Sequence, residues 1–278
     1  MTNVYSAGQI AAAFARAREE GRVALIPYVM AGYPDLATSE ELAVALCQAG
    51  ADILELGVPF SDPLADGVTI QAAGQRSLAQ GTTLTATIAL ARRISLRVTT
   101  PIVLMGYYNP IYSFGVERFC AIAGGQGVRG VIVPDLPPEE AEPLWTAANR
   151  SAMEMIFLVS PTSTPERIAQ VAEIAGRTGD GFIYCVSLSG VTGARDRLPE
   201  HLAAFIARVR AATKLPLAVG FGVGRPEHVA EIGTLADGAV VASALLNAVD
   251  VAPPDERVAA GVAFLRALQT GAAREKPL

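Results

Sequence analysis

Short apolar runs alternate with longer amphipathic segments along the whole chain. The apolar runs are nearly continuous, which is typical of strands buried on both faces of a parallel sheet. We predict strands at residues 23–30, 52–57, 102–107, 130–134, 155–159, 182–186, 217–220 and 238–242. Apolar residues at helical spacing predict helices at residues 6–20, 38–50, 85–98, 116–123, 138–150, 165–175, 200–213, 225–233 and 255–270.

The number of these units predicts a closed barrel. Eight strand–helix units follow one extra N-terminal helix, and eight is the number that closes a parallel barrel. A doubly wound open sheet is the competing architecture, but the even spacing of the units favours closure. No polar linker divides the chain. We therefore expect residues 1–278 to form a single (β/α)8 TIM barrel of the α/β class.

Composition narrows the class of protein. The chain has 278 residues, of which 51% are hydrophobic and 18% charged, and this excludes disorder. Its net charge of −5 argues against general nucleic-acid binding. The apolar stretch at residues 23–32 is about half the roughly 20 residues that a membrane span needs. Three widely spaced cysteines without metal-binding spacing predict buried, reduced thiols in a cytoplasmic protein.

A carboxylate interrupts one of the apolar runs. Glu55 lies within Ile-Leu-Glu-Leu-Gly at residues 53–57, where every neighbour is expected to be buried. Burial of an isolated carboxylate is costly unless it is paired or protonated. Barrel enzymes place their chemistry at the carboxyl ends of the strands. Glu55 is therefore a candidate acid–base group, although a structural glutamate held by arginine or backbone amides would give the same pattern.

The loop after this strand carries two further acids. Residues 59–67 read Pro-Phe-Ser-Asp-Pro-Leu-Ala-Asp-Gly, so Asp66 follows Glu55 by eleven positions at the same end of the predicted barrel. Two carboxylates in different environments commonly supply acid and base steps to one substrate. Asp-Pro and Asp-Gly pairs also form ordinary turns. The pattern predicts that Glu55 and Asp66 converge on one cavity. The alternative is that Asp66 only forms a turn with the glycine that follows it.

Three consecutive strands near the end of the chain finish in small residues. The following segments, 189–193, 220–224 and 242–244, contain Gly193, Gly222 and Ser243. Glycines let backbone N–H groups approach a ligand, and we predict that Ser243 caps a short helix at 244–248 whose N-terminus attracts an anion. Glycine at one strand end would indicate only a turn. Three such ends in order predict a phosphate site, which barrels often hold there.

Several segments of the chain resemble motifs of a known protein family. Residues 54–67, Leu-Glu-Leu-Gly-Val-Pro-Phe-Ser-Asp-Pro-Leu-Ala-Asp-Gly, closely resemble the signature of tryptophan synthase alpha chains. Residues 104–110, 134–137, 189–193 and 219–223 resemble further family motifs in the same order. The family is a (β/α)8 barrel that cleaves indole-3-glycerol phosphate to indole and glyceraldehyde 3-phosphate by a retro-aldol step. The resemblance implies this activity, within tryptophan biosynthesis.

The resemblance also implies roles for individual residues. Glu55 matches the general acid–base, and Asp66 matches the carboxylate that binds the indole N–H. Tyr184 matches a tyrosine close to the acid–base, while Gly193, Gly222 and Ser243 match phosphate-binding positions. The residues expected to line the apolar pocket for the indole ring are Tyr28, Met105, Ile132 and Phe221. His201 and His228 fall in predicted helices away from the strand ends, and we expect both to be surface or helix residues.

Family members usually work with a second chain. The resemblance implies a heterotetramer of two alpha and two beta chains, with pyridoxal phosphate in the beta chain and no cofactor or metal in this one. Asp62 and the pair Asn109-Pro110 lie in predicted loops that could face this partner, although Asp62 could simply cap a turn. Two alternatives stay open. The chain could be a free-standing lyase that releases indole, or a non-catalytic barrel that activates a partner.

Overall fold

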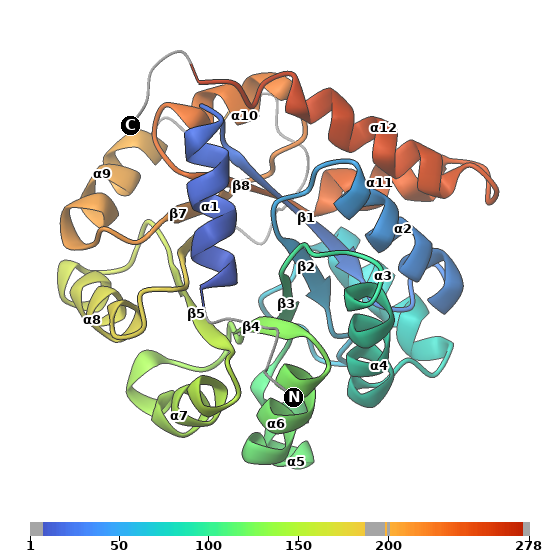
Figure 1. The fold of residues 1–278 in the computed structure, drawn as a ribbon, viewed down its shortest axis with the longest axis horizontal. Coiled ribbons are helices and arrows are strands. Elements are labelled where there is room, and N and C mark those ends of the chain that lie inside the picture. Colours follow the sequence, from blue (N-terminus) through green and yellow to red (C-terminus); the bar gives the residue numbers. More distant parts are fainter. Residues whose placement is uncertain (1–7, 187–197, 199–200, 275–278) are drawn as a thin grey trace.

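The described residues form a closed barrel of eight parallel strands (Figure 1). The computed structural model describes residues 8–186, 198 and 201–274. Each strand pairs with the next along the chain, and β1 pairs with β8, which confirms the predicted barrel over the doubly wound sheet. The strands are β1 (Ala24–Met30), β2 (Leu54–Gly57), β3 (Ile102–Met105), β4 (Val128–Ile132), β5 (Glu154–Val159), β6 (Ile183–Val186), β7 (Leu217–Gly220) and β8 (Gly238–Val241).

Helices surround the barrel, and two of them were not predicted. α3 has a weakly apolar sequence with Gly74 at its centre, while α5 is one of the shortest helices and contains Pro110. Neither offers the long apolar periodicity on which a sequence prediction depends. The described helices are α1 (Gln9–Glu19), α2 (Leu36–Gln48), α3 (Val68–Ala79), α4 (Leu84–Ser95), α5 (Tyr108–Phe114), α6 (Val116–Gly125), the 3-10 helix η1 (Pro138–Glu140), α7 (Glu142–Arg150), α8 (Pro165–Gly176), α9 (Leu202–Ala212), α10 (Pro226–Gly233), α11 (Ser243–Val251) and α12 (Arg257–Gln269).

Alternation along the strands determines which side chains face the barrel interior. On β2, Leu54 and Leu56 pack outward against the helices, whereas Ile53 belongs to the interior cluster. Because successive side chains of a strand point to opposite faces, Glu55 points inward with Ile53. The same alternation on β6 turns Tyr184 inward and Cys185 outward.

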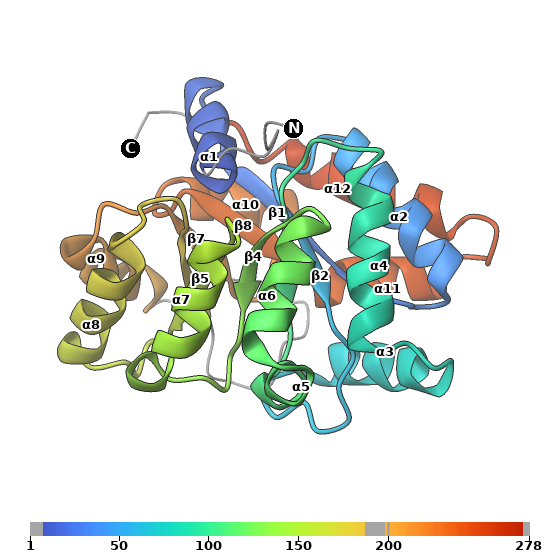
Figure 2. The same cartoon turned by 60° about the horizontal axis from the view of Figure 1, so that its bottom comes forward.

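Helix α1 closes one end of the barrel, as Figure 2 shows. Its Ile10 and Phe14 belong to the same cluster as the inward-facing strand residues. The carboxylate of Asp180 accepts hydrogen bonds from the N–H groups of Gly8 and Ala11, at 2.7 and 2.9 Å, and so satisfies the N-terminus of this helix. α3 and α5 lie toward the opposite end (Figure 2). The functional cavity must therefore open at that opposite end.

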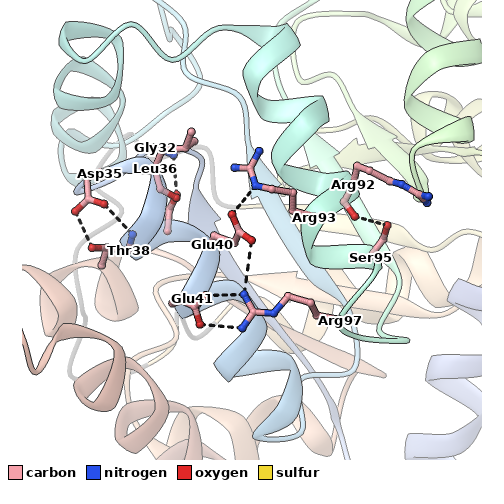
Figure 3. Close-up of polar contacts among 11 residues, drawn as sticks. Gly32, Asp35, Leu36, Thr38, Glu40, Glu41, Arg92, Arg93, Ser95 and Arg97 are labelled. Carbon is pink, nitrogen blue, oxygen red and sulfur yellow. Dashed lines mark hydrogen bonds and ion pairs between the residues drawn. The ribbon is translucent and has the colours of Figure 1, made fainter.

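The start of α2 differs from the prediction. The helix begins at Leu36 and not at residue 38; Asp35 is its N-cap, because its carboxylate accepts from the N–H and the hydroxyl of Thr38 at 2.8 and 2.6 Å (Figure 3). Ser39 lies inside the helix, where its hydroxyl accepts from the N–H of Gly32 at 3.0 Å. Thr38 and Ser39 are also residue types that can cap a helix, but the loop before α2 places Asp35 at the capping position.

Two further observations bear on the class of protein. Cys47, Cys120 and Cys185 are buried free thiols, as predicted. Among the described helices, none combines the length and the apolar character that crossing a membrane requires.

Candidate active site

A cavity of about 410 Å³ opens at the carboxyl ends of the strands. Its wall is built by segments that follow strands, together with the last inward-facing residues of the strands themselves. The residues predicted from the sequence that line it are Tyr28, Glu55, Asp66, Met105, Tyr184, Gly222 and Ser243. Glu55 and Asp66 thus converge on one cavity, as their spacing predicted.

Glu55 lies on the floor of this cavity in an apolar setting. The residue is 1% exposed, and in the described part of the chain its Oε2 has no hydrogen-bond partner. Burial, with a smaller contribution from the charge of Asp66, raises the pKa of Glu55 from 4.5 to about 8. Glu55 is therefore protonated near neutral pH and can donate a proton.

Asp66 reaches the cavity from the loop between β2 and α3. The N–H of Ala65 donates to the Tyr107 hydroxyl at 2.9 Å, and Gln71 of α3 donates to the Asp66 carbonyl at 2.9 Å. Burial raises the pKa of Asp66 to about 6, and the nearby Tyr107 hydroxyl partly opposes this shift. Near neutral pH the site therefore holds one protonated and one ionised carboxyl group.

Two tyrosines frame the acid–base candidate. Tyr28 is the register partner of Glu55 across β1 and β2. A Cβ on Gly57 would lie 2.0 Å from the Tyr28 hydroxyl, so only glycine leaves room for this ring. Tyr184 lines the same cavity, and burial together with the charge of Glu55 raises the pKa of its hydroxyl. Both phenols are neutral, and they surround Glu55 with aromatic surface.

The opposite wall consists of backbone at two strand ends. Gly222 has a φ of 75°, in the left-handed region that favours glycine. α11 begins at Ser243 itself, so the prediction that Ser243 caps a helix at 244–248 is wrong: Ser243 is the first helical residue. Its buried hydroxyl has no hydrogen-bond partner in the described part of the chain. The N–H groups of a first helical turn have no partner within the helix, so they offer an anion site here.

Three predicted site residues are not on the described cavity wall. Ile132 is fully buried in the interior cluster that also contains Tyr184, so it packs beneath the wall. Phe221 faces the helical layer, where its ring lies 6.1 Å from that of Phe205. Ile132 faces the barrel interior but is covered there by other side chains, and Phe221, just after β7, belongs to the cluster between barrel and helices; the motif reveals neither. Gly193 lies outside the described residues.

Several residues near the site were missed by sequence reasoning. Tyr107 stacks on Phe60, with ring centroids 5.1 Å apart, and its hydroxyl fastens the Asp66 loop. Ser160 and Ser163 follow β5 and line the cavity; their place after a strand was the available signal. His228 lies in α10, as expected; it is buried there, and its Nδ1 accepts from the Gly224 N–H at 3.3 Å. His201 is exposed, as expected.

A metal site is not apparent in the described part of the chain, where no three His, Cys, Asp or Glu side chains gather to hold an ion. The polar groups that line the described cavity are two carboxyl groups, two phenols, the hydroxyls of Ser160, Ser163 and Ser243, and backbone N–H groups.

Comparison with known proteins agrees with this geometry. The family model for the tryptophan synthase alpha chain matches residues 14–272. A tryptophan synthase alpha chain from Roseiflexus sp. is 51% identical over 262 residues, which cover 94% of this chain and 99% of the relative. One from Chloroflexus aurantiacus is 47% identical over 267 residues, which cover 96% of this chain and 99% of the relative.

Solved structures give the same result. A structure of Mycobacterium tuberculosis tryptophan synthase matches with a TM-score of 0.88 at 36% identity, covering 96% of this chain and 99% of the other. Tryptophan synthase subunit alpha from Legionella pneumophila matches with a TM-score of 0.85 at 33% identity, covering 96% and 98%. The whole barrel, together with the segments that build the cavity, is thus shared. This chain belongs to the tryptophan synthase alpha chain family.

Proposed function

We propose that this chain performs its family's reaction in the cavity between Glu55 and Ser243. The family comprises carbon–carbon lyases of tryptophan biosynthesis that cleave indole-3-glycerol phosphate to indole and glyceraldehyde 3-phosphate, and this chain is such a lyase. The observation that carries the site assignment is Glu55: it is buried, one of its oxygens is unpartnered among the described residues, and it shares its cavity with a second carboxylate.

Glu55 is the proposed general acid–base. Indole is a poor leaving group until its C3 is protonated, because only then can the ring accept the electron pair of the breaking bond. The protonated Glu55 gives its proton to C3, and the resulting carboxylate takes the proton of the glycerol hydroxyl next to the ring. The C–C bond then breaks, its electrons return to the indole, and the hydroxyl carbon becomes the aldehyde.

Asp66 is the proposed partner of the indole nitrogen. Protonation at C3 puts positive charge on that nitrogen, and an ionised carboxylate beside the N–H stabilises this charge. The effect is larger in a cavity from which water is excluded. The apolar contacts of the ring are assigned to Tyr28, Met105 and Tyr184, which line the cavity near the carboxyl groups.

The phosphate is assigned to the wall that Gly222 and Ser243 form. The first turn of α11 presents N–H groups and the positive end of its dipole to the cavity, and an anion at this position is stabilised by both. The Ser243 hydroxyl can donate a further hydrogen bond. A phosphate here holds the glycerol chain across the cavity toward Glu55.

A beta chain is the partner of this family, and the rim of the barrel fits one. Leu64 is 95% exposed and Tyr112 is 67% exposed, so large apolar surface faces solvent near the cavity. Asp62 is also exposed and accepts from the Ser61 hydroxyl at 2.5 Å, which agrees equally with a turn. Asn109 lies in α5 and not in a loop, and it is exposed. We propose that this rim contacts the beta chain in a heterotetramer.

Pyridoxal phosphate belongs to the beta chain in tryptophan synthase, and we expect the reaction of this chain to need no cofactor of its own. Protonation of the indole ring supplies the electron sink that a cofactor would otherwise provide. We also propose a location in the cytoplasm, where buried free thiols such as Cys185 stay reduced.

Indole formation by the purified chain tests this proposal. We expect slow turnover of indole-3-glycerol phosphate by the chain alone and faster turnover when a beta chain is added. Equal rates with and without beta chain would favour the free-standing lyase. Absence of indole under both conditions would contradict the proposal and favour a non-catalytic role.

A further inference from the structure

The two ends of the proposed substrate site are carried by two neighbouring helices. Asp66 lies two residues before α3, and the loop that holds it is fastened to this helix by Gln71, which donates to the carbonyl oxygens of Asp66 and Pro63 at 2.9 and 3.4 Å. Ser243 is the first residue of α11. A shift of α3 against α11 would therefore change the distance between the indole end and the phosphate end.

Apolar packing between these helices covers only their inner sides. Ile70 and Ala73 of α3 meet Leu246 of α11 in a small cluster that also contains Tyr28 of the cavity wall. Farther out, a cleft of about 260 Å³ separates the helices. The walls of this cleft include the polar side chains of Arg76, Asn247 and Asp250, so apolar contact alone does not fix the spacing of the two helices along their outer edge.

A polar cluster spans this cleft. The hydroxyl of Tyr33 donates to Asp250 of α11 at 2.5 Å, and Arg76 of α3 donates to the same carboxylate oxygen at 2.7 Å. Arg76 also donates to the Tyr33 oxygen at 3.2 Å, and its guanidinium carbon lies 5.7 Å from the centre of the Tyr33 ring. These three side chains thus join α3, α11 and the loop after β1.

The three side chains of this polar cluster differ in how deeply they are buried. Tyr33 is only 4% exposed, whereas the side chains of Arg76 and Asp250 are 57% and 40% exposed. An exposed ion pair alone contributes little to stability, about 0–1 kcal/mol. Here, however, the carboxylate is also held by a buried phenol, which fixes its position and lowers the pKa of Asp250. The cluster is therefore better suited to fixing geometry than to stabilising the fold.

We propose that Tyr33, Arg76 and Asp250 form a clamp that sets the distance between the indole-binding and phosphate-binding ends of the site. The three are positioning residues, since none of them lines the cavity described above. The inference rests on the proposed function, because it takes Asp66 as the indole end and Ser243 as the phosphate end.

Ligands that occupy one end or both ends test the clamp. Indole probes one end and inorganic phosphate the other, while indole-3-propanol phosphate spans both and lacks the hydroxyl needed for cleavage. In Asp250→Ala and Tyr33→Phe we expect the spanning ligand to bind about five- to tenfold more weakly, with less than about a twofold change for indole and phosphate. Asp250→Asn keeps an acceptor for Tyr33 and should recover most of the affinity.

A matched surface pair provides the control. Arg97, two residues after the end of α4, binds Glu41 of α2 through two hydrogen bonds of 2.6 and 2.9 Å, with side chains 39% and 57% exposed (Figure 3). Glu41→Ala removes an ion pair of similar exposure whose two residues do not line the cavity. We expect unchanged affinity for all three ligands in this variant.

The possible results distinguish a failure of the clamp from a failure of the proposed substrate site. If the wild-type chain binds all three ligands and the clamp variants bind the spanning ligand equally well, the clamp is overturned while the site assignment stands. Equal weakening of all three ligands would show a general structural role and would also overturn the clamp. If the wild-type chain does not bind the spanning ligand, the proposed site fails, and the clamp fails with it.

Discussion

The carboxyl groups of Glu55 and Asp66 line one cavity, and the charge of Asp66 adds to burial in raising the pKa of Glu55 to about 8. Asp66, less deeply buried, has a pKa of about 6. The same pair of residues is therefore split near neutral pH into an acid and an anion.

Removing the proton of Glu55 should stop the chemistry and spare the phosphate end. In Glu55→Gln we expect kcat to fall by at least roughly 10²-fold, the usual minimum for a lost acid–base group. Inorganic phosphate should bind as in the wild type, because the amide does not reach the first turn of α11. Steady-state kinetics and a phosphate titration measure the two effects. Near-normal turnover would contradict the acid–base assignment.

Charge coupling between the carboxyl groups should be visible in the pH profile. We expect kcat/KM of the wild type to fall above about pH 8, as Glu55 loses its proton. Asp66→Asn removes the neighbouring negative charge and should lower the pKa of Glu55, by less than the shift that burial causes. An NMR titration of the Glu55 carboxyl group in both proteins measures this. An unchanged pKa would mean that the groups do not interact.

Burial of Glu55 should also make stability depend on pH. The native state keeps the Glu55 proton up to about pH 8, whereas the unfolded chain releases it near pH 4.5. The native state binds more protons in this window, so the free energy of unfolding should decrease as pH rises through it. Glu55→Gln should lose most of this decrease. Urea unfolding at pH 5, 7 and 9 compares the two proteins, and parallel curves would contradict the raised pKa.

A negative charge at the phosphate wall should weaken substrate binding. We expect Ser243→Asp to raise KM by at least about tenfold, because the new carboxylate repels the phosphate at close range. Ser243→Ala is the matched control: it keeps the backbone N–H and loses only the hydrogen bond of the hydroxyl, so its KM should rise less than that of the aspartate variant. If KM is unchanged in the aspartate variant, the phosphate lies elsewhere.

The cap of α2 gives a prediction about stability alone. Asp35→Ala should lower the free energy of unfolding by about 0.5–2 kcal/mol, since the N–H of Thr38 loses its acceptor. Asp35→Ser keeps a capping oxygen and should recover part of this loss. Chemical unfolding of the three proteins measures the difference, and equal stability would show that Asp35 does not cap the helix. Turnover should be unaffected in both variants.

Local pattern was sufficient for the barrel and for predicting that Glu55 and Asp66 line one cavity. The apolar runs determined eight strands because burial on both faces demands continuous apolar sequence, and Glu55 stood out because it interrupts such a run. Asp66 followed from its place in the next loop. These inferences succeed because strand burial and strand order can be read from residues close together in the chain.

Tertiary structure alone decided what depends on distant partners. Packing in the closed barrel covers Ile132 completely and places Phe221 against Phe205, although the motif grouped both with the pocket. The hydrogen bond between Ala65 and Tyr107 and the one between Tyr33 and Asp250 join residues 42 and 217 positions apart. Such contacts depend on how helices and loops pack, and a sequence pattern read over a few turns carries no information about which distant side chain will fill a given space.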